Sequence, residues 1–183
     1  MAVIGQYKLD TQDISAKGAD NVAKGHSWVN GQRVEVHGNI FTNEVWLKSN
    51  GDVKPVFGRA CFFDGTDNDN RGKATVGQTG NYTVFAGVLE NVDFYNNSSP
   101  LLNDEANANQ VTLIRKGCVR NSQVLDATGA PDTSAVPKYG DKVFAYTNNG
   151  VVTCGATVPN NAVEIGVVIT VLENNSYIYS IEV

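Results

Sequence analysis

The stretch VEIGVVITVLENNSYIYSIEV, which spans residues 163–183, decides the fold class of this chain. Its first part, residues 163–172, is almost continuously apolar, as is typical of a strand covered on both faces. In its last part, residues 177–183, two sets of side chains alternate and therefore lie on opposite faces of a strand. One face carries Tyr177, Tyr179, Ile181 and Val183, and the other carries Ile178, Ser180 and Glu182. Asn174-Asn175 lies between the two parts, and Asn tolerates the positive φ of a tight turn. The stretch predicts two strands joined by a hairpin.

Similar signals recur along the rest of the chain. Residues 33–37 (RVEVH) alternate, with both valines on one face. Asn30-Gly31, Asn50-Gly51 and Asn149-Gly150 each lie between two β-like segments, where Asn and Gly favour tight hairpin turns. The one helical candidate is residues 100–108, and its Asn residues are poor helix formers. We therefore expect an all-β fold, an antiparallel β-barrel or sandwich of short strands and hairpins with an extended N-terminal arm.

The predicted arm covers residues 1–25, where a weak alternation of apolar residues is followed by a stretch rich in Gly, Ala, Lys and Asp. A terminal segment of this kind frays unless something holds it, and a neighbouring chain is one candidate. Residues 26–183 are expected to form a single β domain, with two related halves, about 26–95 and 110–183, as an alternative within it.

A faint internal similarity suggests these halves. Residues 23–36 are similar to 136–146, and residues 84–88 are similar to 164–168. Each half thus runs as a glycine turn, an alternating strand and an apolar strand with a central Gly. The competing explanation is that all β-hairpins share this pattern.

The charge balance limits the kinds of partner. The chain has 183 residues, of which 42% are hydrophobic and 18% charged, and its net charge is −5 at pH 7. A nucleic-acid groove needs a basic surface, so we expect no nucleic-acid partner. No stretch approaches the roughly 18 apolar residues of a membrane span, and no apolar run of a signal peptide opens the chain. These features predict a protein made in the cytoplasm, with no membrane partner.

Residues that could carry chemistry are sparse. Cys61, Cys118 and Cys154 are odd in number and far apart, so reduced thiols in the core are expected rather than disulfides. His26 and His37 have no other metal-binding Cys or His beside them, whereas a zinc site normally needs about three or four ligands. We therefore expect no catalytic residue, no cofactor and no metal. A carboxylate pair for glycoside hydrolysis stays open, because such a pair leaves no local signature.

The loop at residues 64–72 (DGTDNDNRG) is the strongest metal-like feature. Asp67 and Asp69 are spaced as in the first half of an EF-hand loop. Arg71 occupies a ligand position, however, and Gln78 stands where the bidentate Glu of an EF-hand belongs. Asp and Asn also favour turns for their own backbone-capping reasons. We expect a solvated loop that binds no metal.

Aromatic and apolar residues beside predicted loops are the candidates for a binding interface. Aromatic side chains carry much of the binding energy of interfaces, although burial in the protein's own core is their commoner fate. The apolar residues of the arm have no evident partner within the chain. The predicted interface residues are Val3, Ile4, Tyr7, Leu9, Trp28, Trp46, Phe94 and Tyr95.

Several glycine-centred segments together carry a likeness to a known family. They are the NGQRV turn and strand at 30–34, FAGV at 85–88, KGCV at 116–119, YGDKVF at 139–144 and IGVV at 165–168. With these segments the chain resembles the structural cement proteins of tailed bacteriophages. The likeness covers most of residues 20–183, and its motifs are glycine positions and alternation rather than a chemical signature.

The resemblance implies a mechanical role with no catalysis. A capsid cement (decoration) protein binds the outer surface of the assembled phage head at junctions between capsomers and stabilises the shell. The implied partners are the phage major capsid protein and further copies of this chain, as a dimer or trimer, and the implied location is the virion. The main alternative is a carbohydrate-binding adhesive module of a head fibre or tail tip, because β folds with exposed aromatic residues also bind sugars. Another virion part, such as a tail-tube or baseplate protein, is a further alternative.

Overall fold

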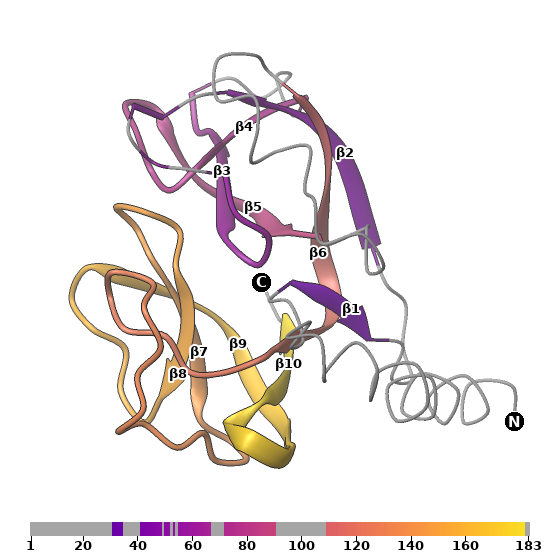
Figure 1. The fold of residues 1–183 in the computed structure, drawn as a ribbon. Coiled ribbons are helices and arrows are strands. Elements are labelled where there is room, and N and C mark those ends of the chain that lie inside the picture. Colours follow the sequence, from indigo (N-terminus) through magenta and orange to yellow (C-terminus); the bar gives the residue numbers. More distant parts are fainter. Residues whose placement is uncertain are drawn as a thin grey trace, which may run out of the picture.

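The computed structural model describes residues 31–34, 41–48, 50–51, 53, 55–66, 72–90 and 109–181 (Figure 1). The predicted arm at 1–25, the helical candidate at 100–108, and both histidines lie outside these residues.

The described chain is all-β, as the sequence predicted. The strands are β1 (Gln32–Val34), β2 (Phe41–Lys48), β3 (Ala60–Asp64), β4 (Lys73–Val76), β5 (Tyr82–Leu89), β6 (Asn109–Asn121), β7 (Lys142–Tyr146), β8 (Val152–Gly155), β9 (Ala162–Val171) and β10 (Tyr177–Ile181). One turn of 3-10 helix, η2 (Glu173–Asn175), lies between β9 and β10.

Strands β2, β4, β3, β5 and β6 pair in that order, and β6 pairs back with β2, so they form a closed five-stranded barrel. Among the described strand pairs, β2–β4 is parallel and the others are antiparallel. Alternate side chains of each strand point inward and fill the barrel. The largest inward-facing cluster comprises Val45, Leu47, Phe57, Cys61, Phe63, Ala74, Val76, Ala86, Leu89, Val111 and Leu113.

Strand β6 belongs to two sheets. Its first part closes the barrel against β2, whereas residues 117–121 pair with β10 and 118–120 pair with β1. The second sheet therefore has the order β1-β6-β10-β9-β7-β8. Figure 1 shows β6 running from the barrel into this second sheet. One continuous strand thus fixes the barrel and the second sheet relative to each other.

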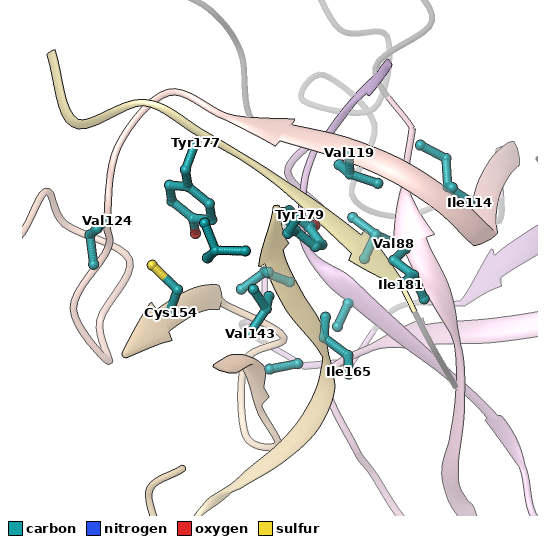
Figure 2. Close-up of a cluster of buried hydrophobic side chains, with 14 of the residues drawn as sticks. Val88, Ile114, Val119, Val124, Val143, Cys154, Ile165, Tyr177, Tyr179 and Ile181 are labelled. Carbon is teal, nitrogen blue, oxygen red and sulfur yellow. The ribbon is translucent and has the colours of Figure 1, made fainter. Parts of the chain in front are cut away.

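A second core joins the barrel to the second sheet. Ala60 and Phe62 of β3 point out of the barrel into a cluster that also contains Tyr177 and Tyr179 of β10. Figure 2 shows barrel residues and β10 residues converging in this cluster. Because the intervening side chains of β3 fill the barrel, β3 is buried on both faces.

Two predicted hairpins are confirmed and a third is wrong. Asn149-Gly150 joins β7 to β8, and Asn174-Asn175, both at positive φ, join β9 to β10. Asn50-Gly51 does make a tight turn, closed by a bridge from Asn50 to Val53. The strand before that turn, however, pairs with β4 and β6 rather than with β3, because β2 closes the barrel. Of the predicted turn at Asn30-Gly31, only Gly31 is described, with φ +83°.

The expectation that 163–172 is covered on both faces holds only for the middle of the strand. Ile165 and Val168 are buried in the second core. On the opposite face Ile169 packs against a small cluster of Cys118 and Ile178. At the end of β9, Val171 is 41% exposed.

The barrel and the second sheet repeat one pairing scheme. Strands β3, β4, β5 and β6 pair as β4-β3-β5-β6, and strands β7, β8, β9 and β10 pair as β8-β7-β9-β10. Cys61 of β3 pairs with Gly87 of β5, and Val143 of β7 pairs with Gly166 of β9. In both ladders the register shifts immediately after this glycine pair. The same irregularity at the same place in two sheets indicates that the two sets of strands are equivalent.

Hydrogen bonds before the first strand of each set support the equivalence. Gly58 donates its N–H to the carbonyl of Leu89 over 2.9 Å, and Gly140 donates to Val168 over 2.9 Å. Both glycines have positive φ, +80° and +82°. The structure thus aligns residues 57–63 with 139–145, whereas the sequence similarity had aligned residues 23–36 with that region.

The aligned interiors differ in polarity. Where the barrel has Leu113, paired with Leu89, the second sheet has Tyr179, paired with Val168. Nearby, Tyr177 accepts a hydrogen bond of 2.9 Å from Asn121 Nδ2. The second core therefore contains two buried tyrosines, of which Tyr177 is hydrogen-bonded, whereas aliphatic, phenylalanine and cysteine side chains fill the barrel.

Candidate partner-binding surface

Exposed large apolar side chains are the starting point, because binding surfaces use such groups as anchors. Among the described residues they are Phe41 (56% exposed), Trp46 (51%), Val84 (52%), Val136 (58%), Tyr139 (80%) and Val171 (41%). Two of the three aromatic residues lie on β2.

The backbone of β2 holds Trp46 in a fixed position on the outer wall of the barrel. Trp46 is paired with Lys73 of β4 on one side and with Gln110 of β6 on the other. Its N–H donates to the carbonyl of Gly72 over 2.7 Å. Val45 and Leu47 point into the barrel, so strand alternation directs the indole of Trp46 outward. The indole is therefore presented from a rigid support.

Charged residues neighbour Trp46 and Phe41 along β2 and on the adjacent strands. Lys48 follows Trp46 on the same face of β2, and its Nζ lies 5.6 Å from the centroid of the Tyr82 ring. Lys73 lies opposite Trp46, and Lys116 lies opposite Phe41. We call this surface the β2 wall, and it comprises the exposed side chains of Phe41, Glu44, Trp46, Lys48, Lys73 and Lys116.

A second exposed aromatic residue lies at the tip of a turn in the second sheet. The N–H of Lys138 donates to Asp141 Oδ2 over 2.8 Å, and the N–H of Asp141 donates back to the carbonyl of Lys138 over 3.0 Å. These two bonds hold Tyr139 at 80% exposure. Its equivalent in the barrel, Phe57, is 9% exposed and packs inside the barrel.

Of the predicted interface residues, Trp46 alone lies in the described part of the chain. Core burial was the commoner outcome expected for these aromatic residues, but the indole of Trp46 is half-exposed. Val3, Ile4, Tyr7, Leu9, Trp28, Phe94 and Tyr95 lie outside the described residues. Sequence reasoning missed Phe41 and Tyr139. The Gly-Asp sequence after Tyr139 was the available signal, because a residue at the tip of a tight turn is rarely buried.

The metal-like loop is described only at its ends. Asp64 Oδ1 accepts hydrogen bonds from the N–H of Thr66 over 2.9 Å and from its hydroxyl over 2.7 Å. This carboxylate therefore caps its own turn, which is the structural role expected of Asp in a loop. Residues 67–71 lie outside the described ranges, and within those ranges no group of three or more His, Cys, Asp or Glu is placed to hold a metal ion.

All three cysteines are buried free thiols. Burial raises the pKa of Cys61 and Cys118 above the ordinary value near 9.0 and raises the pKa of Cys154 to about 12. A thiolate is the reactive form of cysteine, so a raised pKa and a buried sulfur both suppress reaction.

The folded protein should therefore resist thiol reagents. With Ellman's reagent at about pH 8, the native chain should react slowly and release its three equivalents only after denaturation. A Val84→Cys variant serves as the control, because that position is exposed and should add one rapidly reacting thiol. Rapid release of three equivalents from the folded protein would contradict the burial of these sulfurs.

No protein-family model and no curated protein matches this sequence. The described ranges contain no helix that is long and apolar enough to cross a membrane.

Proposed function

We propose that this protein is a capsid cement protein that binds the outer surface of an assembled phage head at the junctions between capsomers. The observation that supports this role best is the β2 wall, where the exposed Trp46 lies on a strand of a closed barrel. Such an anchor suits binding to a preformed surface, because little conformational freedom is lost when the partner is contacted.

The segments behind the family resemblance are positioned to specify the fold. FAGV at 85–88 lies in β5, KGCV at 116–119 in β6 and IGVV at 165–168 in β9. YGDKVF at 139–144 forms the turn before β7 and most of that strand. Apart from the exposed side chains of Tyr139 and Lys116, these segments supply mainly paired strands and buried side chains, so most of a partner-binding surface must come from other residues. The β2 wall shares with them only Lys116.

The proposed mechanism is geometric. A junction site exists only when neighbouring capsomers are held together, so a protein that spans the junction binds the assembled state preferentially. A ligand specific to one state stabilises that state by RT ln(1 + [L]/Kd). The shared strand β6 and the second core join the barrel and the second sheet into a single rigid unit. An anchor on the barrel can therefore resist separation of the capsomers.

The test uses phage heads stripped of this protein or assembled without it. We expect the purified protein to bind assembled heads far more tightly than free capsid subunits and to raise the temperature of DNA release. Trp46→Ala should weaken binding by about thirtyfold, because truncating a central aromatic anchor costs about 2 kcal/mol. Val84→Ala is the control, since it removes an exposed side chain from another strand.

Binding constants from sedimentation and DNA release followed with a dye provide the readouts. If the wild-type protein does not bind heads but binds host-surface glycans, the result would contradict the cement function and support the adhesive alternative. Equal binding by the Trp46→Ala and wild-type proteins would remove the β2 wall from the attachment surface.

A further inference from the structure

We propose that the β2 wall recognises an acidic protein surface, in which carboxylates surround an apolar pocket that receives the Trp46 indole. This inference rests on the proposed function, because it names the chemistry of the capsid surface that the wall would meet. It also reverses the simplest expectation from the net charge of −5, which favours basic partners.

Lysines of the β2 wall differ from a lysine of the second sheet in whether a carboxylate pairs with them. Within the described part of the chain, neither Lys73 nor Lys116 has a carboxylate within ion-pair distance, although both are exposed. On the second sheet, by contrast, Lys142 Nζ lies 2.7 Å from Glu164 Oε2. Among the described residues, a chain with more acidic than basic residues has thus placed no counter-ion beside Lys73 or Lys116.

Lys73 and Lys116 lie beside the exposed aromatic residues of β2. Trp46 and Lys73 are direct partners in adjacent strands, which lie about 4.8 Å apart in a sheet. Lys116 is paired with Phe41 farther along the same strand of the wall. Each of the two exposed aromatic residues on β2 therefore has a lysine as its cross-strand neighbour. An apolar anchor with a charged rim is the usual anatomy of a protein interface.

The occupant follows from charge complementarity. Ammonium groups beside an aromatic anchor favour a partner that offers carboxylates, and such attraction acts chiefly on association rate and specificity. Nucleic acid is the weaker choice, because a nucleic-acid groove needs an extended basic surface and the β2 wall offers only a few lysines beside Glu44. Complementary charge on the capsid would also orient the protein, since the wall is on one side of the barrel.

The experiment compares wild-type protein with Lys73→Glu, with Lys73→Glu/Lys116→Glu and with Lys138→Glu. Lys138→Glu is the matched control, because it makes the same charge change at an exposed turn of the second sheet. Affinity for stripped heads is measured at ionic strengths from about 0.05 M to about 0.5 M, a range over which exposed charge pairs become screened. Circular dichroism checks that each variant is folded.

We expect wild-type affinity to fall with added salt. Lys73→Glu should weaken binding at low salt by about tenfold and the double variant by about a hundredfold, and these losses should shrink as added salt screens the charges. Lys138→Glu should stay within about twofold of the wild type. Salt-independent wild-type binding, or equal losses in the wall and control variants, would overturn the acidic-partner inference while leaving head binding intact. No wild-type binding to heads at all would instead overturn the proposed function, and binding of free DNA through these lysines would replace the acidic partner by nucleic acid.

Discussion

Gly166→Ala is expected to abolish the folded state. A Cβ at this position would overlap the carbonyl oxygen of Ser180 and lie 2.9 Å from the carbonyl carbon of that residue. Neither atom can move away without a large cost in free energy, because β9 and β10 are paired through this region and Ser180 is part of the ladder. Overpacking against a fixed backbone belongs to the small class of substitutions that cost more than about 4 kcal/mol, which approaches the total stability of many domains.

The matched control is Gly155→Ala in β8 of the same sheet. A Cβ there would lie 3.8 Å from the ring of Phe144, which is ordinary van der Waals contact. Urea unfolding followed by far-UV circular dichroism should show cooperative unfolding for wild type and Gly155→Ala and no folded baseline for Gly166→Ala. The equivalent Gly87, with φ +142°, should be similarly intolerant of Ala, which tests the repeat. A cooperative Gly166→Ala protein with an unchanged midpoint would refute the close approach of β9 and β10.

Short-range patterns predicted the all-β fold and the last hairpin. Tyr177, Tyr179 and Ile181 alternate in sequence and are all buried on one face of β10. Asn174 and Asn175 adopt the positive φ expected between β9 and β10. These features depend on neighbours in sequence, so periodicity and turn chemistry sufficed.

Barrel closure could not be predicted from the same patterns. Strand β3 carries apolar side chains on both faces, so it lacks the alternation that marks a half-buried strand. The pairing of β2 with β4 is parallel and joins segments separated by a third strand, so no turn between them signals it. Because Asn50-Gly51 matches a hairpin turn, local chemistry suggested the wrong neighbour for β2.

The candidate surface could be predicted only in part from the sequence. Trp46 stood out as an aromatic residue beside a predicted turn, but its exposure follows from the inward orientation of Val45 and Leu47 in a closed barrel. The contribution of Lys73 to the same surface follows from the parallel β2–β4 ladder. Residue type identified the anchor, whereas topology placed the cation beside it.

Phe62→Ala should be the most damaging truncation at the junction between barrel and second sheet. Phe62 has no exposed surface and packs edge-on against Phe85, with ring centroids 6.2 Å apart. Its side chain belongs to the barrel strand β3 but lies in the core shared with β9 and β10. Removing a buried phenylalanine ring costs about 3–5 kcal/mol, through lost burial and the cavity that remains. The loss should therefore weaken both sheets together.

The control is Phe41→Ala, which removes the same ring from a position that is 56% exposed and should change stability by no more than about 0.5 kcal/mol. Urea unfolding measures the two free-energy changes, and amide hydrogen exchange locates them. Because β6 is continuous through both sheets, Phe62→Ala should reduce protection of the Val168 amide in β9 as well as amides of β3 and β5. Reduced protection confined to the barrel would show that the second sheet is stable without it. Reduced protection in both would show that the shared core couples the stability of the barrel to that of the second sheet.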